Sequence, residues 1–131
     1  MKVFVDTSAL YAMLDKDDLN HNAAKQGWLE LLDNGHDLVT TNYVLVECCA
    51  LSQRRLGMQA ARAIEESAIP VLRIHWVEER LHAMAMAAFL AAARRKLSLV
   101  DCVSFVTMRN LGIGTAFAYD GHFLEEGFAA V

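Results

Sequence analysis

Val3-Phe4-Val5-Asp6-Thr7-Ser8 is the stretch that decides the fold, because an apolar run there ends on a carboxylate and two hydroxyl residues. Continuous runs of β-branched and aromatic residues are typical of parallel strands buried on both faces. Residues 8–14 have a helical composition, so Asp6 is predicted to lie at a strand-to-helix turn. Ligands of open α/β sheets bind at such turns.

The rest of the chain alternates between apolar strands and helices. We predict further helices from residue 20 or 21 to 34 and at 43–55, 58–67, 78–96 and 98–110, and strands at 37–40, 69–74, 114–119 and 128–131. Leu81, Met84 and Ala88 of the long helix are expected to face the core. This alternation predicts a three-layer α/β/α fold with a parallel central sheet of four to five strands, in one domain spanning residues 1–131.

Composition excludes several classes of protein. The 131 residues are 55% hydrophobic with one proline, which argues against disorder. Cys48, Cys49 and Cys102 have neither paired nor metal-type spacing, so we expect small core residues in a reducing compartment, and the scattered histidines do not indicate a zinc site. No stretch reaches the roughly 20 apolar residues of a membrane span, and the chain starts on a strand instead of a signal peptide. A cytoplasmic protein is expected.

Four acidic residues are predicted to meet at one edge of the sheet. Asp6 and Asp120 each follow a strand, and the carboxyl ends of parallel strands share an edge. Crossover helices begin at that same edge, where Asp101 lies in a first turn and Glu47 in a second. Helical side chains lean toward the helix amino terminus, which brings Glu47 back to the edge.

Three of these acids also have a local structural explanation. Asp6 can cap the first helix, and Ser98 followed three residues later by Asp101 fits a capping box. Asp120-Gly121 is a common turn dipeptide. Glu47 has no such explanation, because it interrupts an apolar helical stretch and Arg54 and Arg55 lie about two turns away.

Electrostatics favours a cation among these acids. Two carboxylates about 4 Å apart repel by roughly 4 kcal/mol at an effective dielectric constant of 20, so protons or a divalent ion must relieve the charge. An all-oxygen donor set suits Mg²⁺ or Mn²⁺. A net charge of −4 would ordinarily argue against a nucleic-acid partner. It argues less strongly when several of the acids are concentrated in one site that holds a metal ion.

Four segments, taken in order, resemble the PIN-domain nucleases, most of all the VapC-type toxins of toxin–antitoxin pairs. The likeness covers the whole chain and is carried by Val5-Asp6-Thr7-Ser8-Ala9-Leu10, Thr41-Asn42-Tyr43-Val44-Leu45-Val46-Glu47, Leu99-Val100-Asp101-Cys102-Val103-Ser104-Phe105 and Ala118-Tyr119-Asp120-Gly121-His122-Phe123. The resemblance implies a metal-dependent endoribonuclease, a homodimer and a cognate antitoxin whose tail enters the active-site groove.

The resemblance also implies residue roles. The catalytic and metal-binding set would be Asp6, Glu47, Asp101 and Asp120. Thr7 and Ser104 would support the site, Ser104 by holding a water or a phosphate. Our hypothesis is that Asp6, Asp101 and either Glu47 or Asp120 position one or two Mg²⁺ ions, and that water attacks the RNA phosphorus to leave a 5′-phosphate and a 3′-hydroxyl.

Three alternatives remain open at this point. The chain could be a PIN-like RNA-processing nuclease that is not a toxin, or a non-catalytic module that binds a protein at its sheet edge. Phosphoryl transfer by an aspartyl nucleophile fits less well, because Asp6-Thr7-Ser8 lacks the second acid of haloacid-dehalogenase-like phosphatases.

An RNA substrate requires cations outside the acidic centre. Arg94, Arg95 and Lys96 immediately precede the helix that carries Asp101, which makes them candidate phosphate contacts. They could instead complement the dipole at the carboxyl end of the long helix. A second candidate group comprises Arg54, Arg55 and Arg62.

Overall fold

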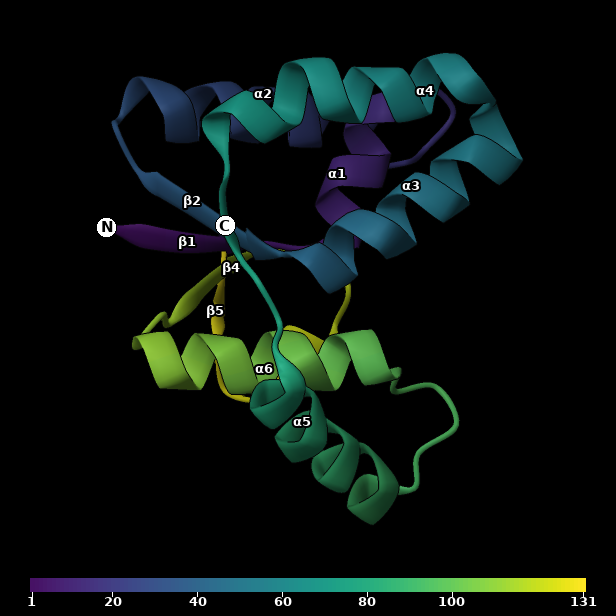
Figure 1. Cartoon of the computed structure of the whole chain (residues 1–131). Coiled ribbons are helices and arrows are strands. Elements are labelled where there is room, and N and C mark those ends of the chain that lie inside the picture. The colour runs from purple at the N-terminus through teal and green to yellow at the C-terminus, as the bar shows by residue number, and fades with distance from the viewer.

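The computed structural model describes residues 1–131 and contains a central sheet between two layers of helices (Figure 1). All neighbouring strands pair in parallel, in the order β3-β2-β1-β4-β5. The strands are β1 (Lys2–Val5), β2 (Asp37–Thr41), β3 (Arg73–His75), β4 (Thr115–Phe117) and β5 (Ala129–Ala130). The predicted α/β/α class and parallel sheet are therefore confirmed, with five strands.

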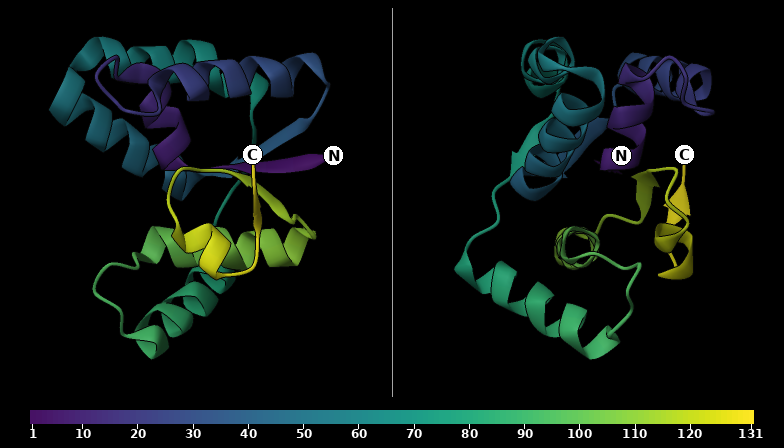
Figure 2. Two further views of the ribbon diagram at one scale, coloured as in Figure 1. Left: turned by 180° about the vertical axis from the view of Figure 1, so that it is seen from behind. Right: turned by 90° about the vertical axis from the view of Figure 1, so that its right-hand side faces the viewer.

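The helices divide between the two faces of the sheet. The first four cover one face and the last three the other, as Figures 1 and 2 show. They are α1 (Thr7–Leu14), α2 (His21–Asp33), α3 (Asn42–Leu56), α4 (Met58–Ala63), α5 (Glu79–Ala92), α6 (Leu99–Leu111) and α7 (His122–Glu125). A π-helical turn at Ile64–Ala68 and a 3₁₀ turn at Ile69–Val71 lead from α4 toward β3.

Strand β1 lies at the centre of the core, as its sequence predicts. Val3, Phe4 and Val5 are fully buried, and Phe4 stacks at a tilt on Phe123, with ring centroids 6.3 Å apart. Phe105 of α6 meets Phe123 edge to face at 5.0 Å. Burial of such side chains contributes roughly 1.5–3 kcal/mol each, so β1 and the residue that follows it are held firmly in place.

Several predicted boundaries are wrong. Residues 69–71 form a 3₁₀ turn instead of a strand, because Pro70 has a fixed φ and no N–H to donate, which suits the first positions of a helical turn. Helix α5 ends at Ala92, where Ala93 adopts a left-handed conformation with φ 50°, so the chain at 94–96 is a connection instead of a helix end.

Some predicted core positions are also wrong. Met84 is 45% exposed and Ala88 is exposed, because α5 packs inward along the face that carries Leu81 and Ala85. Cys48 and Cys102 are buried, but Cys49 is exposed. No helix combines the length and apolar character that spanning a membrane requires.

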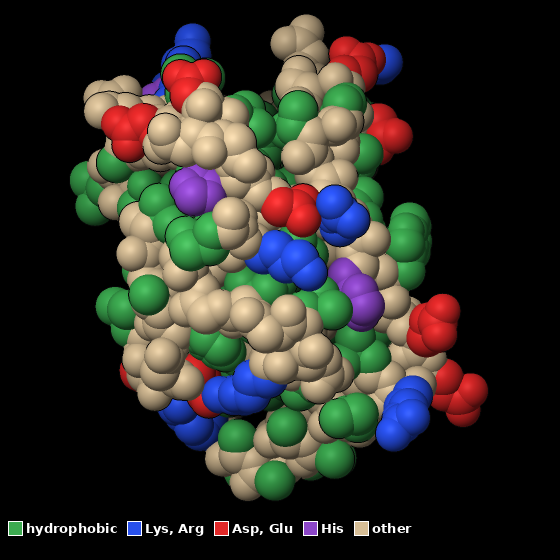
Figure 3. Space-filling view, turned by 90° about the vertical axis from the view of Figure 1, so that its left-hand side faces the viewer, with side chains coloured by type: hydrophobic (Ala, Val, Ile, Leu, Met, Phe, Trp, Pro, Cys, Tyr) green, Lys and Arg blue, Asp and Glu red, His purple; other side chains and the backbone are tan.

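The two ends of the sheet differ in what they display. The right-hand view of Figure 2 looks onto the edge where the strands end and where α1, α3 and α6 begin. Figure 3 shows the opposite face, at the amino ends of the strands, where acidic and basic side chains are interspersed. The predicted acids therefore belong to the edge seen in Figure 2.

Candidate active site

Asp6 joins the end of β1 to the start of α1. It is the N-cap of α1, and its Oδ2 accepts hydrogen bonds from the Ser8 backbone N–H at 3.2 Å and the Ser8 hydroxyl at 2.7 Å. The Ser8 hydroxyl oxygen in turn accepts from the Tyr119 backbone N–H at 2.9 Å. Burial raises the pKa of Asp6 to about 6, against the lowering effect of the Ser8 bonds, and the charges of Asp101 and Asp120 raise it further.

Asp101 lies in the first turn of α6 and is almost fully buried. The predicted capping box is present: the Ser98 hydroxyl accepts from the Asp101 backbone N–H at 3.0 Å, and Asp101 Oδ2 accepts from the Ser98 backbone N–H at 3.1 Å. Burial raises the pKa of Asp101, and the neighbouring charge of Asp120 raises it too. The cap therefore aims a carboxylate at the other acids.

Asp120 follows β4 and meets Asp101 through a shared histidine. Asp120 Oδ1 accepts from the His122 backbone N–H at 2.9 Å. The His122 Nδ1 atom lies 2.9 Å from Asp120 Oδ1 and 3.5 Å from Asp101 Oδ2, within ion-pair distance of both when the ring is protonated. It is buried and makes no hydrogen bond of normal geometry. The three residues offer ligand atoms within 4.8 Å of one another.

Glu47 reaches the same centre from the second turn of α3. That helix is capped by Thr41, whose hydroxyl oxygen accepts from the Val44 backbone N–H at 3.2 Å. Burial raises the pKa of Glu47, a hydrogen bond from the Thr7 hydroxyl lowers it, and the charges of Asp101 and Asp120 raise it. The Thr7 hydroxyl itself donates to the Val44 carbonyl oxygen at 3.5 Å, so the partner that the sequence required for Glu47 is whatever neutralises the group of acids.

The arrangement fits a hard divalent cation. None of Asp6, Glu47, Asp101 and Asp120 forms an ion pair with a lysine or an arginine. Besides burial, the charges of Asp101 and Asp120 raise the pKa values of Asp6 and Glu47, and the charge of Asp120 raises that of Asp101. Crowded carboxylates without a cationic side chain call for protons or a metal. The ligand atoms that lie within 4.8 Å of one another belong to Asp101, Asp120 and His122, and this group does not include Asp6 or Glu47. Oxygen donors suit Mg²⁺ and Mn²⁺, which keep several waters, so Asp101 and Asp120 could hold one, with Asp6 and Glu47 near enough to act through water.

The chain matches the PIN domain over residues 3–128, which is nearly its whole length.

The chain belongs to the PIN-domain family.

Similar proteins include a toxin of known target. The chain is 35% identical over 130 residues to the 23S rRNA-specific endonuclease VapC20 of Mycobacterium tuberculosis, covering 98% of this chain and 97% of that protein. The crystal structure of the same VapC20, described as a sarcin–ricin loop cleaving toxin, superposes with a TM-score of 0.88 and covers 98% of each chain. The resemblance to VapC-type proteins is thereby confirmed.

More distant structures share the fold alone. VapBC2 from Rickettsia felis, bound to a promoter DNA fragment, has a TM-score of 0.71 at 12% identity, covering 100% of this chain and 98% of that one. FitAcB from Neisseria gonorrhoeae has a TM-score of 0.66 at 16% identity, covering 99% and 96%. The PIN fold is therefore retained across wide sequence divergence.

The predicted supporting residues occupy different environments in this PIN domain. Thr7 is buried and its hydroxyl donates to the Val44 carbonyl oxygen at 3.5 Å, at a place where it also lowers the pKa of Glu47. Ser104 is fully buried and donates its hydroxyl to the Val100 carbonyl oxygen at 3.0 Å. Arg94 pairs with Glu125 of α7 at 3.0 Å, and Arg95 and Lys96 are exposed. Because Arg94 directly follows the C-cap residue Ala93, the alternative that these cations complement the α5 dipole stays open beside the phosphate-contact prediction.

Sequence reasoning missed two residues of the centre. His122 lies beside Asp101 and Asp120, and Ser8 links Asp6 to the segment after β4. Both occur two positions after an acid that was identified, at a spacing where a side chain can return to the same turn. That spacing is the signal that could have found them.

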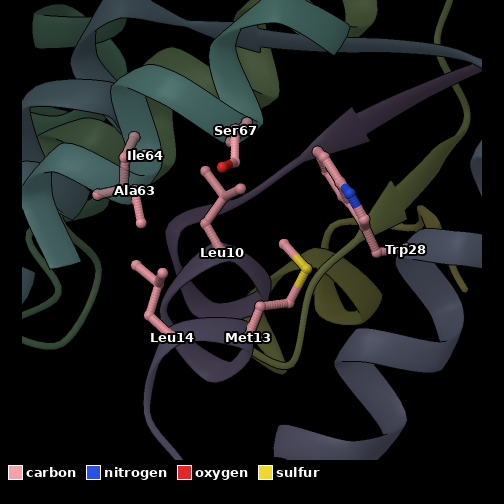
Figure 4. Close-up of a pocket in the computed structure, with 8 residues that line it drawn as sticks. Leu10, Met13, Leu14, Trp28, Ala63, Ile64 and Ser67 are labelled. Carbon is pink, nitrogen blue, oxygen red and sulfur yellow. The ribbon is translucent and has the colours of Figure 1, made fainter. Parts of the chain in front are cut away.

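An apolar cavity lies elsewhere in the molecule. Figure 4 shows it between α1, α2 and α4, with Leu10, Trp28 and Ile64 among its lining side chains and a volume of about 130 Å³. None of the four acids lines it. It therefore supplies no chemistry to the carboxylate centre.

Proposed function

We propose that this PIN-domain protein is a metal-dependent endoribonuclease that hydrolyses RNA phosphodiester bonds and acts as the toxin of a toxin–antitoxin pair. The observation that carries the proposal is the meeting of Asp6, Glu47, Asp101 and Asp120 at one sheet edge without a lysine or arginine partner. Full-length similarity to an rRNA-specific endonuclease supports the choice of RNA as the substrate.

The chain's own residues prepare the site for this reaction. Ser8 and Ser98 orient the carboxylates of Asp6 and Asp101 by hydrogen bonds, and the Thr7 hydroxyl favours the ionised form of Glu47. The four carboxylates would hold Mg²⁺ or Mn²⁺, which when bound activates water and stabilises the charge that develops on the phosphoryl group. Exposed Arg95 and Lys96 are the proposed phosphate contacts, with Arg94 contributing if it leaves Glu125.

The proposed partners follow from the same comparisons. VapC20 is a toxin, and two structural neighbours are of the VapBC and FitAB type, so we propose a cognate antitoxin and a homodimer for this chain. We also propose that the reaction takes place in the cytoplasm, and the similarity to a 23S rRNA-specific endonuclease supports this. A non-catalytic binding module is the weaker alternative, because such a module has no use for acids so close that the charges of Asp101 and Asp120 raise the pKa values of Asp6 and Glu47.

The test is cleavage of total bacterial RNA by the purified protein in Mg²⁺ or Mn²⁺, with a chelator control and sequencing of the new ends. We expect discrete chelator-sensitive cuts that leave 5′-phosphate and 3′-hydroxyl ends. Asp6→Asn protein of confirmed fold is the negative control. If the wild-type protein makes no cut beyond that control, the binding-module alternative replaces the nuclease.

A further inference from the structure

A hollow of about 420 Å³ lies next to the carboxylate centre. It is lined by Asn42, Tyr43, Val46, Glu47 and Val100. Four of these residues belong to the first two turns of α3, and Val100 precedes Asp101 in the first turn of α6. The hollow, here called the α3–α6 hollow, therefore lies between the two helices that deliver Glu47 and Asp101. Its volume falls within the range of small-ligand sites.

The walls of the α3–α6 hollow are aromatic and apolar. The Tyr43 ring packs edge to face on the His82 ring of α5, with centroids 5.9 Å apart, and its hydroxyl contacts His82 Nδ1. These contacts hold the ring in one orientation. Val46 is 68% exposed and contributes an apolar wall open to solvent. Single-stranded RNA is read by such surfaces, on which unstacked bases lie flat.

Asn42 adds hydrogen-bond donors to these walls. Its Oδ1 accepts from the Val77 backbone N–H at 2.6 Å, which fixes the amide and leaves both Nδ2–H donors outside that bond. An amide N–H₂ group pairs with a carbonyl oxygen or a ring nitrogen on a base edge. The apolar cavity of Figure 4 offers Ser67 as its one polar lining residue and borders none of the acids, so it lacks this combination.

We propose that the α3–α6 hollow binds an unstacked nucleobase of the RNA, from a nucleotide beside the bond that is cut. The proposal rests on the RNA-cleaving function proposed above and names the part of the chain that selects the substrate. Glu47 belongs both to the wall of the hollow and to the carboxylate centre, so a base seated there places its own phosphate near the acids. Tyr43, Val46 and Val100 provide contact area, and Asn42 selects a base edge that presents an acceptor.

The first test blocks the hollow from its open side. Because Val46 is mostly exposed, Val46→Trp fills the hollow without disturbing the core. The matched control is Val71→Trp, at an exposed valine outside the hollow. The wild type and both variants are incubated with a pool of random-sequence RNA in Mn²⁺, and the ends of the products are sequenced. We expect Val46→Trp to lose the base preference beside the cut. Its KM should rise about tenfold, which is the loss of affinity expected when one base no longer stacks on the protein. Val71→Trp should match the wild type.

The second test changes the hydrogen-bonding edge. Asn42→Asp keeps an oxygen for the Val77 N–H and replaces the amide donors by an acceptor. We expect the preference beside the cut to move toward bases that present a donor there, with unchanged melting temperature. Unaltered preference in both variants overturns the proposal.

Three further outcomes also test the proposal. If Val46→Trp changes only the oligomeric state on size-exclusion chromatography, with preference and KM retained, the hollow is a subunit contact and the proposal is overturned. If the wild type cuts RNA without preference beside the cut, the base site fails while the nuclease stands. If the wild type cuts no RNA, the proposed function fails and the base site fails with it.

Discussion

Each aspartate of the centre has a structural role beside the metal-binding role proposed for it. Asp6 caps α1, Asp101 completes a capping box, and Asp120 closes a turn onto the His122 N–H. In each case a backbone N–H binds one carboxylate oxygen, Oδ2 in Asp6 and Asp101 and Oδ1 in Asp120, which leaves the other oxygen outside that bond. The local explanation and the metal-binding explanation therefore do not compete, because the cap is what orients the ligand.

Asp6→Asn should abolish cleavage and stabilise the metal-free protein. The pKa of Asp6 is raised from 3.8 to about 6, so the folded protein holds this proton more tightly than the unfolded chain does. Ionising Asp6 therefore lowers the free energy of unfolding. This destabilisation is absent below pH 3.8, grows as pH rises to about 6 and is complete above that, at up to about 3 kcal/mol. Asparagine can still accept the Ser8 bonds and carries no charge.

Thermal melting in chelator measures this effect. We expect Asp6→Asn to melt above the wild type near about pH 7.5 and the difference to shrink by about pH 4. Asp33→Asn, at an exposed position of α2, is the control and should leave melting unchanged. A lower melting temperature for Asp6→Asn at neutral pH would contradict the burial cost assigned to this carboxylate.

Arg95→Ala should weaken RNA binding in a salt-dependent way. Arg95 is exposed in the connection before α6, whereas Arg94 is paired with Glu125. Loss of one phosphate contact reduces the slope of log affinity against log salt by about 1. The assay uses Asp6→Asn protein, which we expect to be inactive, as the background. Arg73→Ala is the control, because Arg73 pairs with Asp37 at the opposite end of the strands, and it should leave the slope unchanged. If Arg95→Ala has the same slope as the background protein, Arg95 does not contact the RNA phosphates.

At the scale of elements, strand identity was predictable and element ends were less so. Strands β1 and β2 follow from short apolar runs, and the Ser98 cap locates the start of α6. The chain between α4 and β3 was mispredicted, because a π turn at Ile64–Ala68 and a 3₁₀ turn at Ile69–Val71 have no apolar period of their own. The early end of α5 depends on Ala93, a residue whose helix propensity gives no stop signal.

Ser98→Ala should destabilise α6 and reduce activity together. The hydroxyl of Ser98 satisfies the Asp101 backbone N–H, and losing an N-cap costs about 1 kcal/mol. Alanine keeps the Ser98 backbone N–H that holds Asp101 Oδ2, but the first turn of α6 that positions both groups loosens, so kcat should fall by more than the loss of folded protein explains. Urea unfolding and cleavage kinetics measure the two effects. Ser67→Ala, an exposed hydroxyl on the π turn, is the control, and a stability loss with full kcat would make the cap purely structural.

At the scale of the molecule, topology places the four acids but sequence order alone does not give their contacts. Because β1 pairs with β2 on one side and β4 on the other, the residues after β1 and β4 are neighbours although more than 100 positions separate them. The meeting of the acids could thus be predicted from a parallel sheet. The position of His122 between Asp101 and Asp120 could not, because it depends on how the short helix α7 packs on the core.

Adding Mn²⁺ or Mg²⁺ should stabilise the whole protein, and more so at neutral than at acidic pH. Metal binds ionised carboxylates, and burial raises the pKa values of Asp6, Glu47 and Asp101, so protons compete increasingly as pH falls through about 6. Ligand at 100 times its dissociation constant stabilises by about 2.7 kcal/mol. Melting curves are recorded with and without Mn²⁺ at two pH values. Mn²⁺ should raise the melting temperature strongly at about pH 7.5 and only slightly at about pH 5. Asp33→Asn should keep the full shift and Asp6→Asn should lose most of it. A shift that is equal at both pH values, or that survives in Asp6→Asn, would place the metal away from these carboxylates.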